Sequence, residues 1–258
     1  MAGLLTDSGE LEGQVILVTG GSRGIGAEIV RQAVARGASV AFCARTPDPA
    51  APALPGAGTQ SGGRVLSLRA DVSRQDEVEA LFDATLRAFG RVDVVVNNAG
   101  ISREALLVSL PVAAWDEVLA TNLTGAFLVS RRAIREFLAQ GTGGRIISIG
   151  SVMQEGAPSN ASYAVSKGGL LGLTQAIAQE YGDRGISAYL VVVGAVETAL
   201  TRDVPEALKR AVIEACPQKR QARADEVAAV VLFLASPRAA LANGQAIRVA
   251  GGMREVMG

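Results

Sequence analysis

The sequence predicts an α/β protein in which a single domain is built on a doubly wound sheet of about seven parallel strands, with helices on both faces. Two observations carry this prediction. Short runs of β-branched and other apolar residues alternate with segments whose apolar residues repeat at helical spacing, and no linker interrupts the alternation. The chain has 258 residues, of which 49% are hydrophobic, and this is ample for one sizeable core. The expected strands are residues 14–19, 39–44, 64–69, 92–96, 145–149, 186–193 and 245–249.

Most segments between these strands are expected to be helices. Residues 46–63 are instead rich in proline and glycine and are expected to form an irregular loop. Residues 195–223 are more polar, and we expect a substrate loop there with a short helix at about 205–215. Residues 1–12 are expected to be an N-terminal tail to a domain at 13–258. The expected helices are about 27–38, 73–89 with Ser73 as N-cap, 111–140, 161–182 and 224–235.

Composition excludes several classes of function. Lys+Arg and Asp+Glu both number 25, and no basic run is interleaved with aromatic residues, so we expect no nucleic-acid partner. The first residues lack a basic n-region, and no run of 18 uncharged apolar residues occurs, so we expect a cytoplasmic protein without a membrane segment. Cys43 and Cys216 lack metal-ligand spacing and are expected to be reduced thiols. The chain has no histidine, so acid–base chemistry must fall to other residue types.

A glycine-rich turn, GGSRGIG, follows the first expected strand. Glycines allow a tight turn and a close approach of the backbone to a pyrophosphate, and the N-terminus of the following helix offers free N–H groups to phosphate. The spacing is GxxxGxG, which predicts a Rossmann-type dinucleotide site; a turn needed only for packing is the alternative. The candidate cofactor contacts in this turn are Gly20, Ser22, Arg23, Gly24, Ile25 and Gly26.

The end of the second expected strand distinguishes NAD from NADP. An acidic residue there would bind the adenosine ribose hydroxyls and repel a 2′-phosphate, but this chain has Ala44 and Arg45. Arg45 and Arg23 could together bind a 2′-phosphate through charge-assisted hydrogen bonds. We therefore expect NADP(H), with two solvated surface arginines as the alternative interpretation.

A Tyr/Lys pair stands at the start of the expected helix at 161–182. Tyr163 and Lys167 are four residues apart, so their side chains project from one face of the helix. A phenol has a reference pKa of about 10, and a nearby ammonium lowers it by favouring the phenolate. The pair is therefore suited to proton transfer. Ser151 precedes the pair, just after the fifth expected strand.

Taken together, these motifs resemble the short-chain dehydrogenase/reductase family. The resemblance covers about residues 12–252 and rests on TGGSRGIG at 19–26, Asp71-Val72, NNAG at 97–100, Asn122, Ser151 and YAVSK at 163–167. Segments 97–109, 146–152, 196–202 and 244–253 are most similar to the 3-oxoacyl-[acyl-carrier-protein] reductases and related ketoreductases of this family. The resemblance implies an NADP(H)-dependent enzyme that transfers hydride to a ketone, such as a 3-oxoacyl thioester linked to acyl carrier protein or CoA. It also implies a homotetramer or dimer assembled through the helices at about 111–139 and 161–182.

The resemblance further implies roles for single residues. Tyr163 would donate a proton to the carbonyl oxygen, which Ser151 would orient. Lys167 would lower the pKa of Tyr163 and hold the nicotinamide ribose, and Asn122 would anchor a water that relays protons to Lys167. Each residue could instead be structural, as a strand-end cap or at a helix kink. The implied cofactor contacts beyond the glycine turn are Arg45, Asp71, Val72, Asn98, Ala99, Gly100, Tyr163, Lys167, Val196 and Thr198.

The chain also departs from the family pattern. Val193-Gly194 stands where the family usually has Pro-Gly, Tyr189 where Asn is common, and Ala250 where Asp or Asn is frequent. These positions concern the nicotinamide and the substrate loop rather than proton transfer. Two alternatives follow: an NADP-dependent alcohol dehydrogenase acting on another secondary alcohol or ketone, and a catalytically weak NADP-binding partner subunit. Docking of a carrier protein would need exposed basic residues near the site, for which Arg184 and Arg220 are the candidates.

Overall fold

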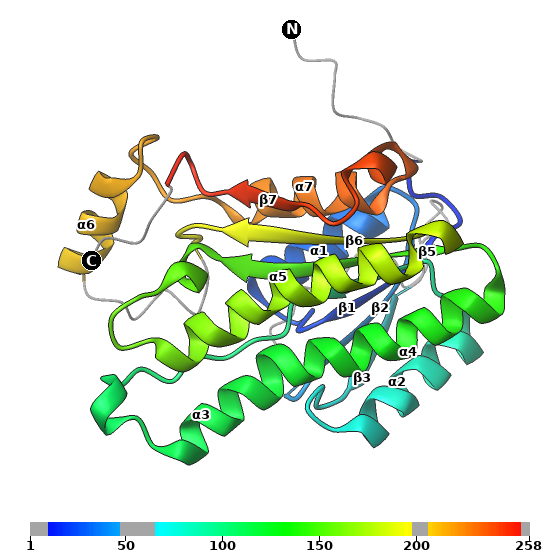
Figure 1. Cartoon of the computed structure of the whole chain (residues 1–258). Coiled ribbons are helices and arrows are strands. Elements are labelled where there is room, and N and C mark those ends of the chain that lie inside the picture. The colour runs from blue at the N-terminus through cyan, green and yellow to red at the C-terminus, as the bar shows by residue number, and fades with distance from the viewer. Residues whose placement is uncertain (1–9, 47–64, 198–205, 254–258) are drawn as a thin grey trace, which may run out of the picture.

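A parallel sheet forms the centre of the computed structural model, which describes residues 10–46, 65–197 and 206–253 (Figure 1). The strand order is β3-β2-β1-β4-β5-β6-β7, and each neighbouring pair is parallel. The order reverses between β1 and β4, so the carboxyl ends of these strands flank the crevice where doubly wound sheets bind ligands. This confirms the predicted fold. The strands are β1 (Val15–Thr19), β2 (Ser39–Ala44), β3 (Val65–Arg69), β4 (Val94–Asn97), β5 (Gly144–Ser151), β6 (Ile186–Val193) and β7 (Ala246–Val249).

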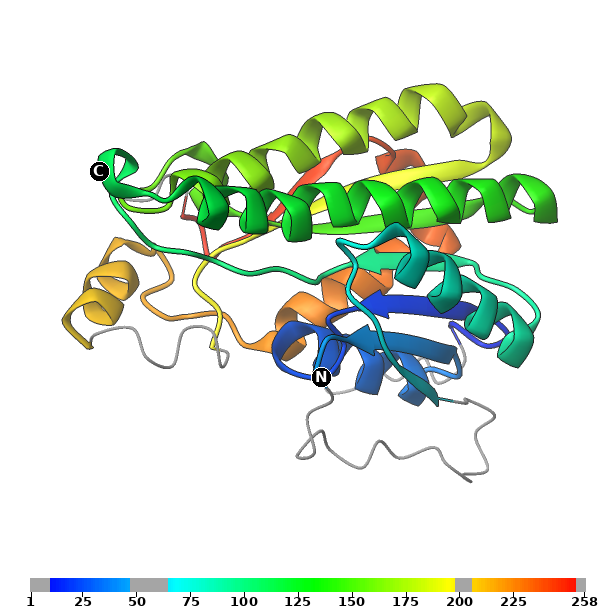
Figure 2. The same ribbon diagram turned by 90° about the horizontal axis from the view of Figure 1, so that it is seen from below.

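Helices cover both faces of the sheet (Figure 2). Helices α1 and α7 pack on one face, and α2, α4 and α5 pack on the other. The helices are α1 (Gly24–Ala35), α2 (Gln75–Phe89), α3 (Val112–Leu119), α4 (Gly125–Gln140), α5 (Ala161–Tyr181), α6 (Glu206–Ala215) and α7 (Ala224–Ala235). None of the helices in the described ranges is long and apolar enough to span a membrane.

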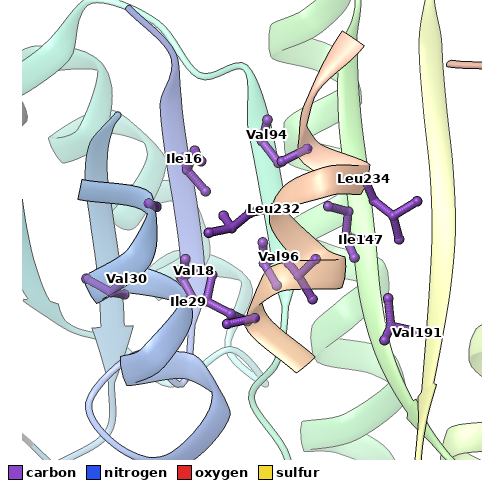
Figure 3. Close-up of a cluster of buried hydrophobic side chains, with 14 of the residues drawn as sticks. Ile16, Val18, Ile29, Val30, Val94, Val96, Ile147, Val191, Leu232 and Leu234 are labelled. Carbon is purple, nitrogen blue, oxygen red and sulfur yellow. The ribbon is translucent and has the colours of Figure 1, made fainter. Parts of the chain in front are cut away.

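The two layers explain why the strands read as continuous apolar runs. Ile16 and Val18 of β1 point into the layer with α1 and α7, whereas Leu17 between them packs into the layer with α2 and α4 (Figure 3). All five residues of β1 are buried, as expected when both faces of a sheet are covered. Leu11, which belongs to the predicted N-terminal tail, is also fully buried among the side chains of the α1–α7 layer.

The structure corrects the predicted start of α2. We expected Ser73 as its N-cap, but the helix begins at Gln75 and Arg74 occupies the cap position. The Ser73 hydroxyl instead donates a hydrogen bond of 2.7 Å to Asp71 Oδ1. A short polar side chain can thus satisfy a neighbouring turn rather than the helix N-terminus, and the sequence does not distinguish the two.

Two other segments differ from the prediction in ways that affect the site. The expected helix at 111–140 is interrupted by a π-helical turn, Ala120–Thr124, between α3 and α4. The fifth strand extends to Ser151, two residues beyond its expected end. Apart from Thr46, the expected loop at 46–63 lies outside the described residues.

Both cysteines are free, as predicted, and both are buried. Burial raises the pKa of the Cys43 thiol to about 12, so it is protonated and unreactive at neutral pH.

Candidate active site

The glycine turn between β1 and α1 leaves no room for a side chain at Gly20 or Gly26. Gly20 has a φ of +67°, and a Cβ atom there would lie 2.9 Å from Ala99 Cα. A Cβ atom at Gly26 would lie 2.2 Å from the carbonyl oxygen of Gly20. Gly24 begins α1 with a φ of +56°. These glycines hold the turn close to the residues that follow β4. They also leave the N-terminal N–H groups of α1 facing the crevice between β1 and β4.

Asn98 and Thr19 fix the shape of this turn. The Asn98 side-chain amide donates hydrogen bonds of 2.9 Å to the carbonyl oxygens of both Thr19 and Gly20. The Thr19 hydroxyl accepts hydrogen bonds of 3.0 Å from the backbone N–H groups of Asn98 and Ala99. We expected Asn98 to line the ribose side of the site, but its amide is bonded within the turn. Thr19 was not among the predicted site residues, although it begins the TGGSRGIG motif.

The other predicted residues of the turn have mixed environments. Ser22 is buried, and Ile25 packs partly against the α1–α7 layer. Arg23 is exposed and stands at the N-cap position of α1 without a side-chain capping bond. Its guanidinium is therefore available to an anionic ligand at the helix N-terminus.

Asp71 and Val72 lie near Arg45 at the carboxyl end of β2. Burial alone would raise the pKa of Asp71, but two hydrogen bonds from Ser73 and the charges of Arg45 and Arg74 together lower it. A Cβ atom at Gly125, the first residue of α4, would lie 2.8 Å from Val72 Cγ2. Val72 therefore packs closely against the start of α4, while Asp71 feels the charge of Arg45. Arg45 reaches Glu117 of α3 only at 4.0 Å.

Ser151, Tyr163 and Lys167 come together at the carboxyl end of β5. Ser151 is its last residue and is buried, and Tyr163 and Lys167 lie on the first turns of α5. Burial raises the pKa of the Tyr163 hydroxyl, and a hydrogen bond with the Ser151 side chain offsets part of this rise. The Lys167 Nζ atom lies 5.7 Å from the centre of the Tyr163 ring. Contrary to the expectation that Lys167 would lower the pKa of Tyr163, the pKa is raised by burial, so the tyrosine is a protonated donor at neutral pH with an ammonium beside it.

Lys167 is nearly completely buried, at 4% exposure. Its ammonium donates a hydrogen bond of 2.7 Å to the carbonyl oxygen of Ile149, and no carboxylate pairs with it among the described residues. Burial lowers its pKa to about 8. A buried cation without a carboxylate partner is unfavourable to stability, and such groups concentrate at functional sites.

Asn122 sits in the π-helical turn and is bonded on all sides. Its Oδ1 atom accepts a hydrogen bond of 2.8 Å from the N–H of Ile101, and its amide donates to the Ile101 carbonyl at 2.9 Å and to Ser166 Oγ at 3.0 Å. Ser166 in turn donates to the carbonyl oxygen of Tyr163 at 2.8 Å. Asn122 therefore ties the segment after β4 to the first turn of α5. π-Helical turns of this kind are frequent at functional sites.

Gly100 lies between Asn122 and Lys167. A Cβ atom there would lie 3.4 Å from Lys167 Nζ and 3.5 Å from Asn122 Oδ1. The structure thus brings Gly100, Asn122, Tyr163 and Lys167 into one neighbourhood, on the same edge of the sheet as the glycine turn. No direct hydrogen bond joins Asn122 to Lys167 within the described part of the chain, so any connection between them runs through other groups.

Tyr189, one of the departures from the family pattern, has a role in packing. Tyr189 is fully buried in the α1–α7 layer, on the face opposite α5, and its hydroxyl donates a 3.0 Å hydrogen bond to the Ala239 carbonyl. It does not reach the Ser151–Lys167 neighbourhood. A Cβ atom at Gly194 would lie 3.0 Å from Ala250 Cα, so the two other departures face each other after β6 and β7.

The predicted contacts beyond β6 are only partly described. Val196 is buried and forms an isolated bridge with Ala222, whereas Thr198 lies outside the described residues. The short helix predicted at 205–215 is α6.

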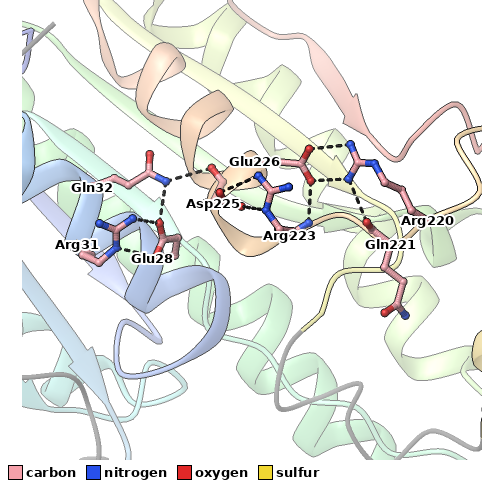
Figure 4. A network of polar contacts seen from close by, with 8 residues as sticks. All are labelled: Glu28, Arg31, Gln32, Arg220, Gln221, Arg223, Asp225 and Glu226. Atoms are coloured by element: carbon pink, nitrogen blue, oxygen red, sulfur yellow. Dashed lines mark hydrogen bonds and ion pairs between the residues drawn. The ribbon is translucent and has the colours of Figure 1, made fainter. Parts of the chain in front are cut away.

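The structure contradicts the placement of Arg184. This residue lies in the turn Gly182–Arg184, immediately before the amino end of β6, whereas the site lies at the carboxyl ends of the strands. Arg220 is near the site's end of the sheet but is bonded to Glu226 through two 2.7 Å contacts (Figure 4). Glu226 also accepts from the backbone N–H of Arg223 at the start of α7. Arg184 is also paired, with Asp183 at 3.4 Å. Both arginines predicted to dock a carrier protein therefore already have a carboxylate partner.

Comparisons with known proteins agree with this geometry. A family model described as enoyl-(acyl carrier protein) reductase matches residues 20–254. The chain is 37% identical over 244 residues to a 3-oxoacyl-[acyl-carrier-protein] reductase FabG of Vibrio cholerae, covering 94% of this chain and 98% of that protein. It is 40% identical over 249 residues to the protein of the same name from Pseudomonas aeruginosa, with the same two coverages.

Two solved structures are similar along nearly their whole length. Levodione reductase has a TM-score of 0.88 and 33% identity, covering 95% of this chain and 98% of that structure. A mutant short-chain dehydrogenase/reductase of Serratia marcescens has a TM-score of 0.88 and 34% identity, covering 95% and 99%. The chain therefore belongs to the short-chain dehydrogenase/reductase family of oxidoreductases.

Proposed function

We propose that this protein is an NADPH-dependent reductase that converts a ketone to a secondary alcohol, with a 3-oxoacyl thioester as the substrate class. The observation that carries the proposal is the grouping of Ser151, Tyr163 and Lys167 on the edge of the sheet that also holds the glycine turn. The names of relatives at 36–40% identity, most of them 3-oxoacyl-[acyl-carrier-protein] reductases, support the substrate class.

The residues present fit a phosphorylated dinucleotide. Glycines at positions 20 and 26 let the turn pack against the residues after β4, and α1 begins directly after this turn, where its N-terminal N–H groups could bind a diphosphate. Arg23 is exposed, and the ion pair of Arg45 within the described residues is a long one of 4.0 Å with Glu117, so both arginines can bind a 2′-phosphate. The proposed remaining contacts are Asp71 and Val72 at the adenine, Ala99, Gly100 and Lys167 at the nicotinamide ribose, and Val196 and Thr198 at the carboxamide. When bound, the reduced nicotinamide supplies a hydride to the carbonyl carbon.

The side chains of the chain supply the proton and stabilise the developing charge. The hydroxyls of Ser151 and Tyr163 interact with each other, so both can point at one carbonyl oxygen. Because burial raises the pKa of Tyr163, its hydroxyl is protonated at neutral pH and can donate its proton to that oxygen. The Lys167 ammonium stabilises the tyrosinate that remains, because it lies beside the ring in a buried environment where charges interact strongly. Two donors aimed at a developing oxyanion give electrostatic stabilisation.

Asn122 and Ser166 keep these groups in register. The Asn122 amide joins the backbone at Ile101 to the Ser166 hydroxyl, which is bonded to the carbonyl oxygen of Tyr163. Asn122 is proposed to position the first turn of α5 and to anchor a water near Lys167. Residues 195–223 are proposed to form the substrate loop over this site.

A homodimer or homotetramer assembled through α4 and α5 is part of the proposal. Three large apolar side chains on these helices are exposed to between 43% and 49%: Phe127, Leu138 and Val165. Exposed apolar side chains gathered on neighbouring helices are typical of surfaces that a second subunit covers.

The proposal is tested with purified protein, acetoacetyl-CoA and either NADPH or NADH. Consumption of NADPH with formation of 3-hydroxybutyryl-CoA is the expected result, with NADH at least tenfold poorer in kcat/KM. Crotonyl-CoA serves as the control substrate, because its reduction needs no proton donor at a carbonyl oxygen of a ketone. Turnover of crotonyl-CoA without turnover of acetoacetyl-CoA would contradict the proposed reaction.

A further inference from the structure

An ionic cluster stands beside the proposed 2′-phosphate site. Glu117 of α3 is bound by Arg103 through two contacts, Nε to Oε2 at 2.9 Å and Nη2 to Oε1 at 2.8 Å. The same Oε1 atom is 4.0 Å from Nη1 of Arg45. Their side chains are between 40% and 47% exposed, so solvent and ligands can reach all three. Glu117 is thus held firmly by one arginine and only loosely by the other.

The cluster spans the crevice where the order of the strands reverses. Arg45 directly follows β2, and Arg103 lies in the segment after β4, while both strands are neighbours of β1 and its glycine turn. The charge of Arg45 also acts on Asp71, which we place at the adenine. Glu117 therefore places a negative charge 4.0 Å from Arg45, the arginine proposed to bind the 2′-phosphate.

We propose that Glu117 is the resident counter-ion of Arg45, which the 2′-phosphate of the cofactor displaces, and that Arg103 sets how strongly Glu117 competes. The inference rests on the proposed function, because it assumes a phosphorylated dinucleotide. It assigns Glu117 and Arg103, neither of which is expected to touch the cofactor, to the selectivity between NADPH and NADH.

The strengths of the two contacts explain the direction of each effect. A bidentate Arg–carboxylate pair is much stronger than a single contact at 4.0 Å, so Glu117 stays with Arg103 when Arg45 turns to a phosphate. Removing the charge of Glu117 takes away one of the two anions that act on Arg45, leaving Asp71, and removes a repulsion felt by the phosphate. Removing Arg103 has the opposite effect, because Glu117 then loses its bidentate partner and keeps Arg45 as its ion-pair partner among the described residues.

The expected size follows from Coulomb's law at a half-exposed site. One unit charge acting on a phosphate at roughly 8 Å, in a medium between water and the protein surface, changes affinity by about 3- to 10-fold. The effect should shrink at high salt, because a separation of this size is comparable to the Debye length of about 8–10 Å.

The test measures binding of two nucleotide fragments that differ only in the 2′-phosphate. Adenosine 2′,5′-bisphosphate and adenosine 5′-monophosphate are titrated calorimetrically into the wild-type protein and the variants Glu117→Gln and Arg103→Gln. We expect Glu117→Gln to bind the 2′-phosphorylated fragment about 3- to 10-fold more tightly, and Arg103→Gln to bind it about 3- to 10-fold more weakly. Binding of adenosine 5′-monophosphate should change by less than about twofold in both.

A matched control separates this effect from net charge. Arg135 on α4 is 60% exposed and pairs with Glu79 at 3.9 Å, away from the cluster. Arg135→Gln removes the same charge as Arg103→Gln and should leave both affinities unchanged. If both cluster variants shift the two fragments equally, or shift the bisphosphate in the same direction, the counter-ion assignment is wrong while the NADPH preference stands. If the wild-type protein binds both fragments equally well, the proposed cofactor preference itself fails, and the role of Glu117 with it.

Discussion

Replacing Lys167 with methionine should stabilise the protein while it removes the proposed activity. Among the described residues the buried ammonium has no carboxylate partner, and its one hydrogen bond goes to the Ile149 carbonyl oxygen. Burial lowers its pKa from 10.5 to about 8, which means that the folded state disfavours the charged form. Methionine has a similar length and no charge, so it fills the same space without this penalty.

The magnitude follows from the pKa. A fall from 10.5 to about 8 corresponds to about 3 kcal/mol of lost stability while the lysine is charged in both states. Loss of the 2.7 Å hydrogen bond to Ile149 offsets about 1 kcal/mol. At pH 7 the variant should therefore gain about 2 kcal/mol in free energy of unfolding, or roughly 4–8 °C in Tm for a chain of this size.

The stability advantage of Lys167→Met depends on pH. The folded-state pKa lies below the unfolded value, so the penalty on the wild-type protein is fully present below pH 8. It is relieved as the pH rises from about 8 to 10.5, because only the unfolded state then binds the proton. The advantage of Lys167→Met should fall by about 1.4 kcal/mol per pH unit above pH 8 and vanish near pH 9.5.

Urea unfolding of the two proteins at pH 7, 8.5 and 9.5 measures this difference, since contributions from other groups cancel. Lys219→Met is the matched control, because Lys219 is 59% exposed and carries no burial penalty. A variant that is less stable than the wild-type protein at pH 7, or whose advantage does not change with pH, would refute the view that Lys167 is a buried, uncompensated cation.

Three further predictions follow from the same structure. Because burial lowers the pKa of Lys167 to about 8, kcat/KM for ketone reduction should be level from pH 6 to 7.5 and fall as the pH rises through about 8; a profile that stays level to pH 10 would show that the charge of Lys167 is not used. Gly26→Ala should lower the free energy of unfolding by about 1–3 kcal/mol and weaken NADPH binding, since its Cβ atom would lie 2.2 Å from the Gly20 carbonyl oxygen. Gly172→Ala is the control: its Cβ atom would meet nothing within 4 Å, so thermal unfolding should show a neutral or stabilising effect. Tyr189→Phe should lower the free energy of unfolding by about 1 kcal/mol through loss of its bond to Ala239 and leave kcat unchanged; a large loss of kcat would connect this departure from the family pattern to the site after all.

The sheet could be predicted from the sequence because each strand is a short apolar run between turn residues. Burial on both faces makes β1 and β6 almost wholly apolar, and the glycine turn marks where β1 ends. The end of β5 was harder to predict, because Gly150 and Ser151 do not continue the pattern of apolar residues although they remain in the sheet. The residues of the π-helical turn, Ala120–Thr124, are also compatible with a continuous helix, so the sequence analysis predicted one helix over 111–140.

The grouping of Ser151, Tyr163 and Lys167 followed from spacing and resemblance, but their surroundings did not. The bonds of Asn98 to the glycine turn and of Asn122 to Ile101 join segments far apart in the chain, and side-chain partners at such distances are set by packing. The same is true of Glu117, whose arginine partners lie in the segments that follow β2 and β4. Arg184 was misplaced although the predicted parallel sheet already puts a residue before β6 at the amino end of that strand, away from the carboxyl ends that hold the site.

The central claim is that Tyr163 donates the proton in an NADPH-dependent reduction. It is tested most directly by Tyr163→Phe, which removes one hydroxyl and keeps the ring that lies beside Lys167. NADPH affinity, measured by titration, should stay within about threefold of the wild-type value, while kcat with acetoacetyl-CoA should fall by at least about 100-fold. A variant that binds NADPH normally and still reduces acetoacetyl-CoA at a rate near that of the wild-type protein would contradict the account.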